Sequence, residues 1–158
     1  MARGVRVGDL APDFTLPSQT GAPVRLADRI GRSAVVLYFY ARDETLGCTA
    51  EACAFRDAFE AFSDAGAEVI GVSSDPVESH RRFAGRLRLP FLLLSDADGA
   101  VRERYGVAKW MGLLPGRVTY VIDRAGIVRR VVSSQLDAVR HVREALAALE
   151  REAPPPIA

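Results

Sequence analysis

Three short apolar runs, separated by segments with helical character, constrain the fold of this chain more than any other feature. They are AVVLYFYA (34–41), AEVIGVSS (67–74) and FLLLSD (91–96). Runs of this length, rich in β-branched and aromatic residues, are typical of strands that are buried on both faces of a sheet. We therefore expect three buried strands, with residues 34–41 in the centre.

The other elements predict a mixed sheet. Strands alternate with helices early in the chain, and a hairpin around DRAG and a final helix follow, which is the order of a mixed α/β sheet. We expect a short hairpin from 14–16 and 24–26, and a later hairpin from 117–123 and 127–133. One helix is expected over 48–65, ending at Gly66, and another is opened by Asp75 as N-cap and Pro76 and runs to Ala84. A short helix over 99–105 and an amphipathic helix over 136–151 complete the set.

The chain shows neither an internal repeat nor a linker, so we expect a single domain over residues 1–152. The remaining residues, 153–158, are expected to form a disordered tail. No stretch is long and apolar enough to span a membrane. The N-terminal residues lack the apolar run of a signal peptide, so a cytoplasmic location is the expectation.

Composition narrows the function. The 158 residues are 49% hydrophobic and 26% charged, which suits a globular protein with a core of its own. The formal net charge is +1, which gives no electrostatic reason to expect nucleic acid or an anionic membrane as partner.

The two cysteines of the chain, Cys48 and Cys53, lie five positions apart in the predicted helix 48–65. Cys48 shares a helix face with Phe55, Phe59 and Phe62, so it should point inward at the helix N-terminus. Unpaired N–H groups and the helix dipole favour a thiolate there, and the thiolate is the nucleophile. On an intact helix the two Cα atoms would be about 8.6 Å apart, beyond the ~7 Å limit for a disulfide.

Several readings of this pair follow from the residues alone. The spacing excludes a C-x-x-C dithiol. Zinc is disfavoured because the further ligands would have to be His80 and His141, which lie on predicted helices and are expected at the surface. A Cys–His hydrolase lacks a positioned base. Inert half-buried cysteines, or a disulfide that forms once the first helical turns unwind, both remain open.

The segment YFYARDETLGCTAEACAFRD resembles the active-site segment of the peroxiredoxins, and specifically the bacterioferritin comigratory protein, or peroxiredoxin Q, branch. Four further stretches are similar to family segments and stand in the same order: VGDLAPDFTLPSQTG, VIGVSSDPVESHRRFA, FLLLSDADGAVRERYGV and RVTYVIDRAGIV. The fold implied by the resemblance is a thioredoxin-like core, a mixed central sheet flanked by helices, with an N-terminal β-hairpin extension.

The resemblance also implies roles for individual residues. Cys48 matches the peroxidatic cysteine and Cys53 the resolving cysteine of the same chain. Thr45 matches the threonine that hydrogen-bonds the peroxide, and Arg117 the arginine that pairs with the thiolate and the substrate oxygens. Neither a cofactor nor a metal is implied.

Two positions depart from the branch. Ala41 stands where the family has proline, and Leu46 stands where this branch often has proline. Losing both should give the loop before Cys48 more conformational freedom. The residues beside the site, Tyr40 and Glu51, are expected to face solvent or to be structural. Trp110, Met111 and Leu113 are expected to pack in the core or to anchor a loop, and the alternative is that they line the wall of the pocket.

The implied function is a thiol-dependent peroxidase that reduces hydrogen peroxide or organic hydroperoxides through a Cys48 sulfenic acid and a Cys48–Cys53 disulfide. The expected reductant is thioredoxin or a similar dithiol protein, and the expected state is a monomer or a weak homodimer. The alternatives are a peroxide sensor or redox relay, which would use the same residues, and a non-catalytic thioredoxin-fold binding module, which the alanine at position 41 keeps open.

Overall fold

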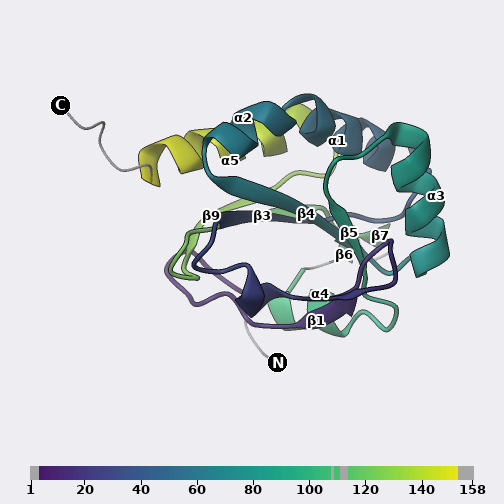
Figure 1. Cartoon of the computed structure of the whole chain (residues 1–158), viewed down its shortest axis with the longest axis horizontal. Helices are drawn as coiled ribbons and strands as arrows, with labels where there is room; N and C mark the ends of the chain where they lie inside the picture. The colour runs from purple at the N-terminus through teal and green to yellow at the C-terminus, as the bar shows by residue number, and fades with distance from the viewer. Residues whose placement is uncertain (1–3, 108, 111–113, 153–158) are drawn as a thin grey trace.

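The computed structural model describes residues 4–107, 109–110 and 114–152, and is built around one five-stranded sheet (Figure 1). The strand order is β5-β4-β3-β8-β9. The strands are β3 (Ala34–Phe39), β4 (Ala67–Ser73), β5 (Leu92–Ser95), β8 (Val118–Ile122) and β9 (Val128–Ser133). β3, β4 and β5 run parallel, whereas β8 pairs antiparallel with both β3 and β9, so the predicted mixed sheet is confirmed.

β3 is the central strand, and all six of its residues are buried. Its side chains alternate between two cores. Val36 and Tyr38 face one core, and Val35, Leu37 and Phe39 face the other. A strand that is covered on both faces has no polar face, which is why the sequence shows a continuous apolar run instead of an alternating pattern.

Helices cover one face of this sheet. The five α-helices of the described chain are α1 (Leu46–Asp57), α2 (Phe59–Asp64), α3 (Val77–Leu87), α4 (Ala100–Tyr105) and α5 (Ala138–Glu152). Side chains of α1, α2, α3 and α5 join the core on the Tyr38 side, and α1 packs against α5 (Figure 1).

The opposite face is covered by α4 and by the N-terminal segment. The predicted N-terminal hairpin forms from β1 (Thr15–Pro17) and β2 (Pro23–Arg25), and the short 3-10 helix η1 (Leu26–Asp28) follows it. Phe14, Val24 and Tyr105 bury their side chains in the core on this face. A small two-stranded ribbon, β6 (Lys109–Trp110) and β7 (Leu114–Pro115), precedes β8. Met111 and Leu113 lie outside the described residues, as do residues 153–158.

The predicted helix over 48–65 is two helices. It begins earlier than expected, at Leu46, and it breaks at Ala58, whose backbone leaves helical geometry at φ −97° and ψ 8°. Beyond the break, Phe62 packs against Phe55 with ring centroids 5.7 Å apart, while Phe59 is only half-buried. Gly66 follows α2 at φ +75°, as expected for a glycine that ends a helix.

Two further expectations are corrected at α3. The helix extends to Leu87, beyond the predicted end at Ala84, and its N-cap is Pro76. Asp75 does not cap it, because its carboxylate accepts hydrogen bonds from Ser73 Oγ at 2.6 Å and from the N–H of Asp43 at 2.8 Å. Among the described helices, none is long and apolar enough to cross a membrane.

Candidate active site

Cys48 lies in the first turn of α1, just beyond the carboxyl end of the central strand. Thr45 is the N-cap residue of that helix, and its Oγ1 accepts a hydrogen bond from the Cys48 N–H at 3.3 Å. The same hydroxyl donates to the carbonyl of Arg42 at 3.1 Å. The Cys48 side chain is buried. The predicted position of this thiol, inward at a helix N-terminus, is confirmed, and the positive end of the helix dipole favours negative charge there.

Arg117, immediately before β8, reaches this helix terminus. A Cβ atom on Gly47 would lie 2.7 Å from Nη1 of Arg117 and 2.8 Å from Cζ, so the guanidinium sits directly against the Gly47 backbone. The Arg117 Nε is buried and has no hydrogen-bond partner among the described residues. The structure therefore brings Cys48, Thr45 and Arg117 together, with one guanidinium N–H still available to an acceptor.

Arg102, in α4, is a second cation at the site, and the sequence analysis missed it. Its Nη2 donates to the carbonyl of Tyr40 at 2.5 Å and its Nη1 donates to the carbonyl of Gly116 at 3.0 Å. Burial lowers the pKa of Arg102, and the charges of Asp96 and Cys48 oppose that shift. Arg102 thus joins the end of β3 to the residue before Arg117.

Cys53 lies further along α1 and is half-buried, and both thiols are free. The two cysteines therefore occupy one continuous helix, as the sequence predicts. A relaxed helix holds positions five apart too far from each other for a disulfide. Bond formation between them requires the first turns of α1 to unwind.

Glu51, on the same helix, is fully buried, so of the two expected alternatives, a solvent-facing or a structural side chain, the structure excludes the first. Neither carboxyl oxygen has a hydrogen-bond partner among the described residues. Burial raises the pKa of Glu51 to about 8, and nearby Arg117 opposes the shift. Glu51 is therefore mostly protonated at neutral pH, although His141 Nε2 lies 3.6 Å from its Oε2.

His141, on α5, is also fully buried, so the expectation of a surface histidine is wrong. Its Nε2 donates to the carbonyl of Ser134 at 2.7 Å, and its Nδ1 lies 2.8 Å from Thr119 Oγ1. Burial lowers the pKa of His141. A neutral ring leaves Nδ1 free to accept from the Thr119 hydroxyl, so the contact with Glu51 joins two neutral groups.

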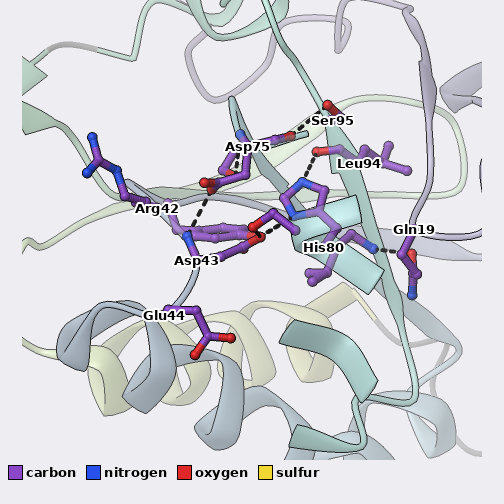
Figure 2. Close-up of polar contacts among 12 residues, drawn as sticks. Gln19, Arg42, Asp43, Glu44, Asp75, His80, Leu94 and Ser95 are labelled. Carbon is purple, nitrogen blue, oxygen red and sulfur yellow. Dashed lines mark hydrogen bonds and ion pairs between the residues drawn. The ribbon is translucent and has the colours of Figure 1, made fainter. Parts of the chain in front are cut away.

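His80, on α3, is the second buried histidine, and it too contradicts the surface prediction. Figure 2 shows it between the carbonyl of Leu94 and the carboxylate of Asp43, at 3.0 and 2.7 Å. Tyr40 is likewise buried, and its hydroxyl donates to Asp43 Oδ1 at 2.6 Å. This polar cluster holds the loop between β3 and α1.

The buried polar residues carry a signal that helical spacing reveals. His80 shares a face of α3 with Phe83, Ala84 and Leu87, all of which are buried. Glu51 lies between Cys48 and Phe55 on the buried face of α1. A polar residue inside an apolar stripe indicates a buried group that needs a partner.

The two departures from the branch differ in environment. Ala41 is half-buried and packs against the core on the Tyr38 face. Leu46, the first residue of α1, is 93% exposed. Ala41 therefore leaves the start of the loop without a ring constraint, whereas Leu46 presents an apolar side chain to solvent beside the Cys48 turn.

Comparison with known proteins gives consistent matches. The AhpC/TSA family matches residues 7–131. A relative from Sedum lineare, "Peroxiredoxin Q, chloroplastic", is 49% identical over 147 residues, which cover 92% of this chain and 78% of that protein. The protein of the same name from Arabidopsis thaliana is 50% identical over 143 residues, which cover 90% of this chain and 66% of that protein.

Solved structures of the same kind of protein also match this chain. Peroxidoxin BcpB from Mycobacterium tuberculosis superposes with a TM-score of 0.86 at 41% identity, covering 93% of this chain and 97% of that one. The bacterioferritin comigratory protein of Xanthomonas campestris gives 0.83 at 29% identity, covering 97% and 100%. The fold is therefore the thioredoxin-like fold of these proteins, and the chain belongs to the AhpC/TSA family as a thiol-dependent peroxidase of the peroxiredoxin Q branch.

Proposed function

We propose that Cys48 is the peroxidatic cysteine and Cys53 the resolving cysteine of this peroxidase, with Thr45 and Arg117 as the residues that bind and polarise the peroxide. The observation that carries this proposal is the meeting of three groups at the start of α1. A buried thiol and a capping hydroxyl of one helix N-terminus meet there with a guanidinium from the residue before β8.

In the first step the Cys48 thiolate attacks one peroxide oxygen. The O–O bond breaks, the attacked oxygen stays on sulfur as the sulfenic acid, and the other oxygen leaves with a proton as water or an alcohol. The helix N-terminus and Arg117 stabilise the negative charge that moves from sulfur to the leaving oxygen.

The hydrogen bonds of Thr45 limit what it can do in this step. A hydroxyl has one hydrogen to donate and two lone pairs. Its hydrogen is directed to the Arg42 carbonyl and one lone pair accepts the Cys48 N–H. The remaining lone pair can accept the O–H of a peroxide, which would orient that peroxide beside the thiolate.

In the second step the Cys53 thiol attacks the sulfenic sulfur, water leaves, and a Cys48–Cys53 disulfide forms. A dithiol protein of the thioredoxin type then exchanges with this disulfide and restores both thiols, while becoming a disulfide itself. Because both cysteines belong to one chain, the cycle is complete in a monomer. The proposal includes a cytoplasmic location, where such reductants keep thiols reduced.

The substrate proposal covers hydrogen peroxide and organic hydroperoxides. The bacterioferritin comigratory protein of Xanthomonas campestris has alkyl peroxide reduction activity. A coupled assay with hydrogen peroxide and an alkyl hydroperoxide, each with thioredoxin as reductant, tests both classes. Repeated turnover supports an enzyme, whereas a single stoichiometric oxidation would indicate a sensor.

Two serine variants separate the roles of the cysteines. Cys48→Ser should abolish peroxide consumption, and unchanged consumption would disprove the assignment. Cys53→Ser should still form the sulfenic acid but no intramolecular disulfide. In the wild-type protein, intact-mass analysis after peroxide treatment should show the loss of about two hydrogens, and digestion should place the bond between Cys48 and Cys53.

A further inference from the structure

The loop that leads from β3 to Cys48 is tied to α3 through one buried side chain, Asp43. Its Oδ1 accepts from Tyr40 Oη at 2.6 Å, and its Oδ2 lies 2.8 Å from Ser79 Oγ and 2.7 Å from His80 Nδ1. Its backbone N–H donates to Asp75 Oδ2 at 2.8 Å. Figure 2 shows Asp43 directed away from α1 and toward this cluster. Four directed contacts therefore hold this one loop residue.

The contact between Asp43 and His80 is the most deeply buried of these. The two side chains are 1% and 0% exposed. Because the Leu94 carbonyl can only accept, His80 Nε2 carries a hydrogen. The short contact on the other side of the ring then shares one proton between Nδ1 and the carboxylate. Removing either partner leaves a buried polar group unsatisfied. Breaking such a pair therefore costs a large part of the folding free energy.

The next residue shows that this loop is held under strain. Glu44 has φ +68°, in the left-handed region that costs free energy for a residue with a side chain. Glu44 also forms a half-exposed ion pair with Arg86 of α3, at 2.7 Å, which contributes little because solvent screens it. Glu44 lies between Asp43 and the Thr45 cap, so the buried pair on one side must oppose the strain that favours release of the loop.

We propose that Asp43 and His80 are positioning residues, which hold the loop before Cys48 in its reactive conformation and set how readily that loop and the first turn of α1 unfold. The proposal rests on the proposed roles of Cys48 and Cys53. The pair supplies, through α3, the restraint that a proline ring at position 41 would otherwise supply within the loop itself.

The two chemical steps respond to this pair in opposite directions. Attack on peroxide needs Thr45, Cys48 and Arg117 held in one geometry, and small displacements in such sites are costly. Disulfide formation needs the same turn to open, because the folded helix separates the two cysteines. Weakening the pair should therefore slow oxidation of Cys48 and accelerate its resolution by Cys53.

The test is a rapid-quench time course on the reduced full-length protein, with hydrogen peroxide as oxidant and mass spectrometry of thiol, sulfenic acid and disulfide. The main variant is His80→Gln. Ser79→Ala is a milder variant, because it removes one neighbouring bond to Asp43 and keeps the pair. Phe62→Leu is the matched control, since it reduces packing in the same core without touching the loop.

For His80→Gln we expect oxidation of Cys48 to slow by about tenfold or more, and disulfide formation to accelerate about threefold. Ser79→Ala should shift both rates in the same directions by less. Phe62→Leu should leave both rates within about twofold while lowering the denaturation midpoint. Hydrogen exchange of peptides covering 42–50 should accelerate in the His80 and Ser79 variants alone. In the double variant Asp43→Asn/His80→Gln, peroxide should oxidise Cys48 no more slowly than in the slower of the two single variants.

The possible outcomes distinguish failure of the proposed function from failure of the positioning role alone. If wild-type Cys48 is not oxidised by peroxide, the proposed function fails together with the role of the pair. If wild-type protein is oxidised normally, but the His80 and Ser79 variants keep both rates and the exchange of 42–50, only the positioning role is overturned. Parallel slowing of both steps in the His80 variant and in the Phe62 control would also overturn it, because general destabilisation would then account for the effect.

Discussion

The buried carboxyl group of Glu51 should make this protein less stable as the pH rises, and Glu51→Gln should remove that dependence. The side chain is fully buried, and burial raises its pKa from an ordinary value of 4.5 to about 8. In the unfolded chain the carboxyl group loses its proton near pH 4.5, whereas in the folded protein it keeps the proton up to about pH 8. Between those values the folded state binds more protons, so the free energy of unfolding falls as the pH rises.

The size of the effect follows from the shift. Each pKa unit corresponds to about 1.4 kcal/mol, so relative to Glu51→Gln the wild-type protein should lose about 3 kcal/mol of stability between pH 4.5 and pH 7. The difference should level off at about 5 kcal/mol above pH 8. Glutamine is the appropriate replacement because it keeps the shape of the protonated side chain and does not ionise.

The assay is guanidinium unfolding of both reduced proteins from pH 5 to pH 9, with the free energy difference plotted against pH. Glu60→Gln is the matched control, because it makes the same chemical change on the exposed side of α2. It should change stability by less than about 0.5 kcal/mol at every pH. A difference between wild type and Glu51→Gln that stays constant from pH 5 to pH 9 would refute the reasoning, since a constant offset reports packing and not ionisation.

Three further substitutions test other contacts. Gly47→Ala should leave the free energy of unfolding nearly unchanged, yet lower kcat/KM by about 10²-fold, because the new Cβ displaces the flexible end of Arg117. Thr45→Val should destabilise the protein by about 1 kcal/mol through loss of the helix cap, and Thr45→Ser should restore it, as denaturation midpoints would show. Gly71→Ala should cost about 1–3 kcal/mol, because its Cβ would lie 2.8 Å from Cζ of Tyr38, while the rate of Cys48 alkylation stays as in wild type.

The sheet was predictable because its strands carry local signals. β3, β4 and β5 appear as apolar runs, and the β8–β9 hairpin is marked by a turn around Asp123 to Gly126. The break at Ala58 was not predictable from the sequence, because no proline or glycine marks it and the apolar stripe continues through it. Beyond the break Phe62 packs against Phe55, and helix propensity does not report a tertiary contact of this kind.

The cysteines, Thr45 and Arg117 were placed by resemblance, and the structure brings Thr45, Arg117 and Cys48 together. The buried polar groups around them were missed or misplaced, since their burial depends on partners far along the chain. His80 reaches Asp43 across 37 positions and Arg102 reaches the Tyr40 carbonyl across 62. Composition and spacing describe one segment at a time, so they do not report which polar side chains find such partners.

The break at Ala58 also determines how large a unit must open when Cys53 becomes accessible. α1 has 12 residues and α2 has six, and Phe62 of α2 is buried in the core against Phe55, near the C-terminal end of α1. In a continuous helix from 46 to 64, unfolding of the first turns would be coupled to the packing of Phe62 in the core. With the helix divided at Ala58, we expect the first turns of α1 to open as a local unit, at a free energy well below that of global unfolding. The turn that carries Cys48 can then open and close many times, while the backbone hydrogen bonds elsewhere in the protein remain protected from exchange.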